Sequence, residues 1–74
     1  MIEVITESGA IYHLDTDNGY AKRLSGPEVQ TRTWDDGVWE QRTLLTDLVV
    51  GQPMLLVSEG RFRNTTPVVS FLDI

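Results

Sequence analysis

Turn-forming residues recur along this chain of 74 residues at intervals of roughly ten positions. They separate short runs in which apolar and polar side chains alternate, which is the period of a strand with one buried face. The clearest turn signals are Ser8-Gly9, Asn18-Gly19, Gly26-Pro27 and Asp36-Gly37. We therefore expect an all-β domain, namely a small, mostly antiparallel barrel or sandwich of about six short strands.

The segments with strand-like patterning are residues 1–7, 10–15, 20–25, 28–34, 38–44, 54–59 and 67–72. In the first segment the alternation places Ile2, Val4 and Thr6 on one face, and in the second it places Ala10, Tyr12 and Leu14 on one face. Lys22 and Arg23 in the third segment are typical of an exposed sheet edge. The nearly continuous apolar run in residues 54–59 predicts a strand buried on both faces.

The connections are predicted from their turn residues. Ser8-Gly9 suits a two-residue hairpin loop, and Asn18-Gly19 is a preferred type I′ pair. Residues 45–51 fit either a short helical turn capped at Thr46 or a loop that plugs one end of the core. Residues 60–66 are expected to form a turn before the last strand.

The hairpin at Asp35-Asp36-Gly37 is expected to organise the domain, because it carries both tryptophans. A three-residue loop with a glycine bulge would place Trp34 and Trp39 on opposite faces, and a type I′ turn at Asp36-Gly37 would place them on the same face. We favour the first register, since it pairs apolar with apolar and acid with base. It predicts a buried Trp39 and a surface Trp34.

The composition limits what such a domain can do. A chain of this length forms a single domain, residues 1–74, with a small core and marginal stability. It contains no cysteine, so disulfides and thiolate metal sites are excluded. Eleven acids against six bases give a net charge of −5, which disfavours non-specific nucleic-acid binding. No apolar run is long enough for a membrane span or signal peptide, and we expect a cytoplasmic protein.

No catalytic, metal-binding or cofactor-binding constellation emerges from the sequence. His13 is the only histidine and has no cysteine partner, so it is interpreted as a strand residue that faces away from Tyr12 and Leu14. Residues 15–19 begin like a calcium loop, but Gly19 is at the fifth position instead of the sixth and no terminal glutamate follows. We predict a non-enzymatic protein without a cofactor.

Surface side chains remain as the carriers of function. Six aromatic residues are too many for a core of this size to bury completely, and exposed aromatics anchor protein interfaces. A protein-binding or self-associating surface is therefore the first hypothesis, with the candidate residues Trp34, Tyr20, Phe62, Arg61 and Arg63. The alternatives are a binder of an anionic nucleotide, with Lys22 and Arg23 as further anion-binding candidates beside Arg61 and Arg63, and a minor virion subunit.

Four stretches carry a resemblance to a known group of proteins, namely residues 7–15, 36–39, 51–57 and 63–68. They contain the serine-glycine turn, the Asp-Gly turn followed by tryptophan, and Arg63-Asn64-Thr65-Thr66-Pro67-Val68. With these features the chain is similar to small uncharacterised accessory proteins of actinobacterial bacteriophages. The resemblance implies an accessory protein that acts inside a bacterial host cell, and it carries over no functional residue.

Overall fold

The computed structural model describes residues 1–24 and 37–74, and all of the regular structure in these residues is β-strand. The strands are β1 (Ile2–Thr6), β2 (Ile11–Asp15), β3 (Tyr20–Leu24), β4 (Glu40–Gln41), β5 (Thr43–Leu44), β6 (Pro53–Ser58) and β7 (Arg61–Asp73). They form one antiparallel sheet in the order β4-β3-β2-β1-β7-β6-β5. The expected all-β, antiparallel architecture is confirmed.

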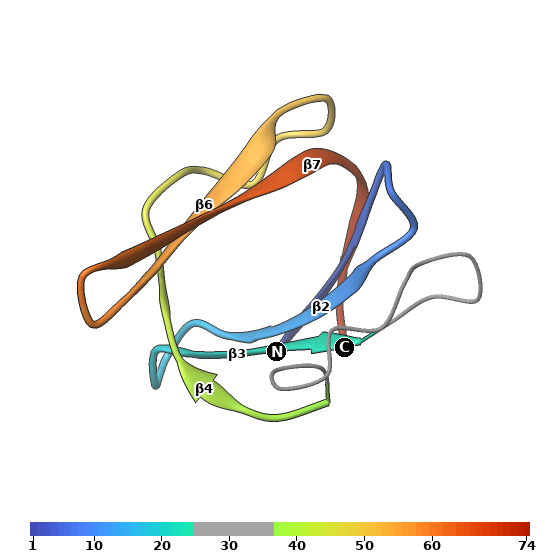
Figure 1. The fold of residues 1–74 in the computed structure, drawn as a ribbon. Coiled ribbons are helices and arrows are strands. Elements are labelled where there is room, and N and C mark those ends of the chain that lie inside the picture. Colours follow the sequence, from blue (N-terminus) through green and yellow to red (C-terminus); the bar gives the residue numbers. More distant parts are fainter. Residues whose placement is uncertain (25–36) are drawn as a thin grey trace.

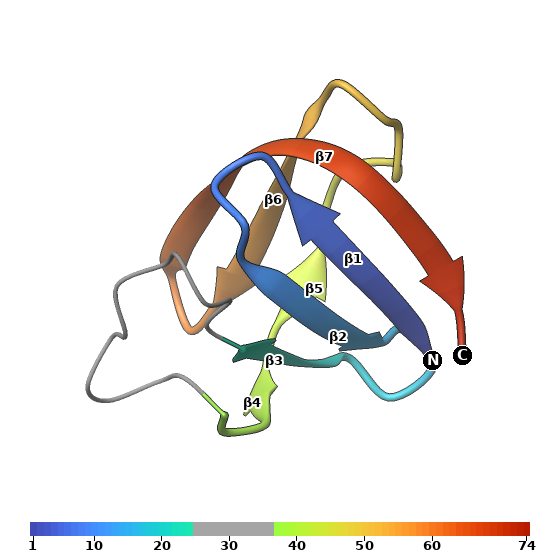
Figure 2. The ribbon, with the colours of Figure 1, turned by 90° about the vertical axis from the view of Figure 1, so that its right-hand side faces the viewer.

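The sheet curls into a half-barrel (Figure 1), because its two edge strands are consecutive in the chain. Only Arg42 separates β4 from β5. Figure 2 shows these two short strands following each other. The Arg42 N–H donates to Gly19 O at 2.8 Å on the β3 side, and the Leu45 N–H donates to Leu55 O at 2.9 Å on the β6 side. Residues 38–44 were expected to form one strand. They instead divide at Arg42, since each half pairs with a different neighbour.

β7 is the longest strand and pairs with two neighbours in succession. Its first half pairs with β6, from Arg61 opposite Ser58 to Pro67 opposite Pro53. Its second half pairs with β1, from Val68 opposite Thr6 to Asp73 opposite Ile2, with a bulge beside Val69. Figure 2 shows β7 arching over the ends of β1 and β6.

The prediction of a turn over residues 60–66 is wrong, because β7 already begins at Arg61. The actual turn is Glu59-Gly60, and both residues have positive φ, 47° and 78°. Two successive positive φ values define the type I′ geometry that matches the twist of a hairpin. Glutamate is an unusual residue there, so sequence alone does not single out this turn.

Two other hairpin loops differ from expectation by one or two residues. The first contains three residues, 7–9, since the Thr6 N–H donates to Ala10 O at 3.0 Å. The second contains four residues, 16–19, between the paired Asp15 and Tyr20. Among the described residues of this loop, Gly19 has positive φ and Asn18 does not, so the pair does not form a type I′ turn.

The core lies on the concave face of the sheet. Its buried apolar residues are Val4, Ala10, Tyr12, Leu14, Ala21, Met54, Leu56 and Val68. The predicted inward faces of the first two strands are confirmed, with Thr6 also buried and Ile2 packed against the cluster. In β6, Met54 and Leu56 are buried whereas Leu55 and Val57 are only half-buried, so one face of this strand is less covered than expected.

Trp39 is not the buried anchor that the sequence predicted. It is 39% exposed, and the Lys22 ammonium lies 4.9 Å from the centre of its ring. The predicted hairpin of residues 32–40, its register and the predicted strand of residues 28–34 lie mainly outside the described residues. Residues 45–51 form a loop and not a helical turn.

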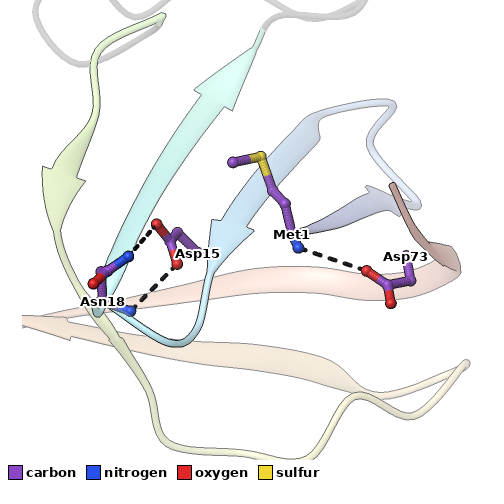
Figure 3. Close-up of polar contacts among 4 residues, drawn as sticks. All are labelled: Met1, Asp15, Asn18 and Asp73. Carbon is purple, nitrogen blue, oxygen red and sulfur yellow. Dashed lines mark hydrogen bonds and ion pairs between the residues drawn. The ribbon is translucent and has the colours of Figure 1, made fainter.

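β3 is an internal strand, flanked by β2 and β4, and therefore not the exposed edge that its basic residues indicated. Ala21 and Arg23 face the concave side, where Arg23 is 5% exposed. Its loop to β2 is fastened by Asp15, which accepts hydrogen bonds from the side-chain and main-chain nitrogens of Asn18 (Figure 3). The same figure shows the two ends of the chain together, with the Met1 amine 3.5 Å from the Asp73 carboxylate.

Candidate binding surfaces

Among the strands that the structure describes, the second half of β7 has a partner on only one side. β6 begins at Pro53, and the last main-chain contacts on that side join Val68 to Gly51 and to Gln52. Beyond this point β1 is the sole described strand that pairs with β7. Figure 2 accordingly draws this half at the margin of the sheet, and we call residues 69–73 the β7 edge.

The direction of the main-chain groups in the β7 edge follows from one contact. The Ile74 N–H donates to Met1 O at 2.8 Å and thus points toward β1. Because main-chain groups alternate in direction along a strand, the N–H and C=O groups of Phe71 and Asp73 point away from β1, toward the open side. The edge thus offers hydrogen-bonding groups to a further strand.

Exposed apolar side chains accompany these main-chain groups. Val69 is 52% exposed, Phe71 44% and Leu72 64%. Met1 and Ile74, which lie beside the same end of the strand, are also more than half exposed. The segment from Val69 to Leu72 contains no charged residue. Apolar side chains gathered at one place mark interaction sites more often than single exposed ones do.

A second candidate surface is a cavity of about 500 Å³ that the first half of β7 helps to form. Its lining residues are Glu40, Arg42, Leu56, Ser58, Glu59, Arg61, Phe62, Arg63 and Asn64. Three of the six basic residues of the chain are thus in its wall, and we call it the arginine cavity. Register explains the grouping, because Arg61 and Arg63 are two positions apart on one strand and share a face.

Arg42 is the most buried arginine of this cavity, at 7% exposure. Its guanidinium donates to a Glu40 carboxylate oxygen at 2.6 Å, and this pair occupies the junction of β4 and β5. Arg42 and Arg63 each take part in a further interaction in the folded chain, as does Arg23. The buried charges are therefore held in place by partners, as burial requires.

The convex face of the sheet carries a row of polar side chains. Glu3, His13 and Lys22 are consecutive partners across β1, β2 and β3. His13 Nε2 lies 3.0 Å from a Glu3 carboxylate oxygen, and Lys22 lies over Trp39. His13 faces away from Tyr12 and Leu14, as the alternation predicted. Lys22 and Arg23 themselves face opposite sides of the sheet, so they do not form one cationic cluster.

The remaining predicted partner residues do not converge on one surface. Tyr20 is 43% exposed and lines a smaller cavity of about 150 Å³, which shares Arg42 and Leu56 with the arginine cavity. Arg61, Phe62 and Arg63 lie together on β7, and Trp34 is outside the described residues. The sequence did not identify Arg42 as a residue of a candidate site. The one local hint is that this charged residue occurs within a segment of strand-like alternation.

Within residues 1–24 and 37–74, no cluster of three or more histidine, cysteine, aspartate or glutamate residues has the arrangement of a metal site. The same residues include no helix with the length and apolar character needed to cross a membrane. Comparison of the chain with protein-family models, curated proteins and solved structures finds no match. The resemblance to phage accessory proteins and the expected cytoplasmic location thus stay predictions.

Proposed function

We propose that this protein is a non-enzymatic binding module that associates with a second copy of itself through the β7 edge. The observation that carries the proposal is that, among the described residues, the main chain of residues 69–73 has a partner on one side only, together with the exposed side chains of Val69, Phe71 and Leu72. A strand added to such an edge extends the sheet, with main-chain hydrogen bonds supplying affinity and apolar side chains supplying buried area.

A second copy suits this edge because an antiparallel strand pair is self-complementary. Two β7 edges related by a two-fold axis present identical groups to each other, which is the commonest symmetry of soluble oligomers. The segment is also free of charge, apart from Asp73, whose carboxylate lies 3.5 Å from the Met1 amine. Elsewhere each copy is acidic, so we expect added salt to strengthen the dimer by screening repulsion.

The test is light scattering on a size-exclusion column over a range of protein concentrations. The wild-type chain is expected to form a dimer that dissociates on dilution. Asp73→Pro removes an N–H that points to the open side and keeps the main-chain contacts with β1, although it also removes the exposed ion pair between the Asp73 carboxylate and the Met1 amine, so it should yield a monomer. Leu72→Lys adds charge to the edge and should do the same.

Phe62→Ser is the matched control, because Phe62 is 68% exposed on the other half of the same strand. It should leave the dimer unchanged. A wild-type protein that stays monomeric at high concentration and high salt contradicts the proposal, and so does an Asp73→Pro variant that still dimerises. Circular dichroism on each variant verifies that the sheet is intact.

A further inference from the structure

The main-chain groups of the β7 edge restrict how two copies of the chain can pair. The N–H and C=O groups of Phe71 and Asp73 point to the open side. Those of Leu72 point the other way, toward its β1 partner Glu3. We infer that two copies join in one register, with Leu72 on the two-fold axis, opposite Leu72 of the second copy. Such an alignment presupposes the proposed self-association and specifies which residues face each other in it.

Hydrogen-bond direction leaves few alignments to choose from. In an antiparallel pair, two opposite residues exchange hydrogen bonds only where the main-chain groups of both point to the partner strand. Within the β7 edge, such a pair must therefore join Phe71 or Asp73 of one copy to Phe71 or Asp73 of the other. This condition is met with the axis at Phe71, at Leu72 or at Asp73. With the axis at Leu72, Phe71 of each copy pairs with Asp73 of the other, so both open-side residues form hydrogen bonds.

The other two alignments are less favourable. With the axis at Phe71, Asp73 is opposite Val69 of the second copy, where the bulge interrupts the regular ladder. With the axis at Asp73, two carboxylates are directly opposite each other, and like charges in that position are destabilising. The Met1 amine lies 3.5 Å from this carboxylate, but the Asp73 side chain is 87% exposed, so solvent screens the ion pair and the repulsion is offset only in part.

The side chains also fit the axis at Leu72. Leu72 shares the convex face with its β1 partner Glu3 and is 64% exposed, more than Val69 or Phe71. On the axis it meets its own copy in a non-hydrogen-bonded pair, the closer type, with Cα atoms about 4.5 Å apart. Ile74 is on the same face and would lie opposite Ser70 of the second copy. The most exposed apolar side chain of the edge is thus covered by an identical one.

Single cysteines test the alignment, because the chain contains no cysteine of its own. Phe71→Cys, Leu72→Cys and Asp73→Cys each place one thiol per copy at a possible axis. On the axis, the Cα atoms of a residue and its copy are about 4.5–5.5 Å apart, within the range of a disulfide, whereas one position away they are about 7–8 Å apart. With oxidised glutathione as the oxidant, Leu72→Cys should form the cross-linked dimer about tenfold faster or more than the other two, as measured on non-reducing gels.

A mixture of Phe71→Cys and Asp73→Cys chains provides a second measurement that leaves Leu72 intact. These two positions face each other across the interface when Leu72 is on the axis. The mixed dimer should therefore form faster than the self-linked dimer of either variant. Phe62→Cys is the control, because Phe62 is 68% exposed on the first half of β7, and it should cross-link only through random collisions.

The outcomes separate the alignment from self-association itself. Fastest cross-linking at Phe71→Cys or Asp73→Cys, or equal rates at these positions, Leu72→Cys and Phe62→Cys, overturns the alignment. If the wild-type chain is nevertheless a dimer by light scattering, self-association stands and only the alignment is wrong. A wild-type chain that stays monomeric contradicts both.

Discussion

The two halves of β7 belong to one continuous strand but have different surroundings. The first half pairs with β6, carries Arg61 and Arg63 and borders a cavity. The second half pairs with β1, carries Val69, Phe71 and Leu72 and, within residues 1–24 and 37–74, has no strand partner on its other side. The difference shows that a strand longer than its neighbours acquires two separate surfaces, because no single partner covers its full length.

The largest effect on this comparison should come from Leu56→Ala. Leu56 is 1% exposed, lies on β6 opposite Arg63 of β7 and belongs to the core cluster. Truncation should lower the free energy of unfolding by about 2–5 kcal/mol, since the cavity left behind adds to the lost apolar burial. Urea denaturation followed by circular dichroism measures the change.

Phe62→Ala is the partner measurement for Leu56→Ala. Phe62 is next to Arg63, the residue of β7 that lies opposite Leu56, but it is mostly exposed. We therefore expect its truncation to change the free energy of unfolding by less than about 0.5 kcal/mol. Equal losses in the two variants would mean that Phe62 is packed and that the first half of β7 does not present an open aromatic surface.

A smaller effect is expected from Glu40→Gln, across the arginine cavity from β7. The change removes the carboxylate charge that lies 2.6 Å from the buried Arg42 guanidinium. We expect a loss of about 1–2 kcal/mol, at the lower end for a hydrogen bond to a charged group because the Glu40 side chain is 32% exposed. Urea denaturation at low and high salt provides the measurement.

Glu3→Gln is the control on the convex face, where the partner is His13 at 3.0 Å and the carboxylate is more exposed. Its loss should be smaller, below about 1 kcal/mol. If Glu3→Gln lowers the free energy of unfolding as much as Glu40→Gln does, the more buried ion pair does not contribute more to stability than the more exposed one.

Glu59→Asn tests the turn that starts β7. Residue 59 has a φ of 47°, a conformation that asparagine adopts more readily than glutamate does. The substitution should raise the free energy of unfolding by about 0.5–1 kcal/mol. It is measured by thermal melting, with Gly60→Asn as a comparison that should instead destabilise. A neutral or negative result for Glu59→Asn would show that other contacts of Glu59 stabilise the turn.

The smallest effect concerns Asp15, which is remote from both halves of β7. Hydrogen bonds from Asn18 lower the pKa of the Asp15 carboxyl from its ordinary value of 3.8. A lowered folded pKa adds stability above the ordinary value, and this stability is lost as the pH falls through the folded pKa. Asp15→Asn should therefore flatten the acid limb of the stability curve below about pH 4 and leave dimerisation unchanged.

Local patterning determined much of this fold. The period-two alternation of Ile2, Val4 and Thr6, and of Ala10, Tyr12 and Leu14, predicted the buried faces, because a strand has only two sides. Glycine-containing pairs marked the first two hairpins, although the exact loop lengths depend on hydrogen bonds that no dipeptide specifies.

Tertiary structure decided what the two candidate surfaces are. Whether Trp39 is buried depends on where β3 places Lys22, and the location of Arg42 depends on the chain crossing from one edge of the sheet to the other. The long span of β7 likewise has no local signal, since its Thr65-Thr66-Pro67 segment resembles a turn until β6 and β1 supply partners on either side. Which side chains of a strand share a face depends on residues two positions apart, so the sequence predicts it. Which strand lies at an edge and which residues line a cavity depend on pairing between segments that are distant in the chain, and the sequence by itself does not specify that pairing.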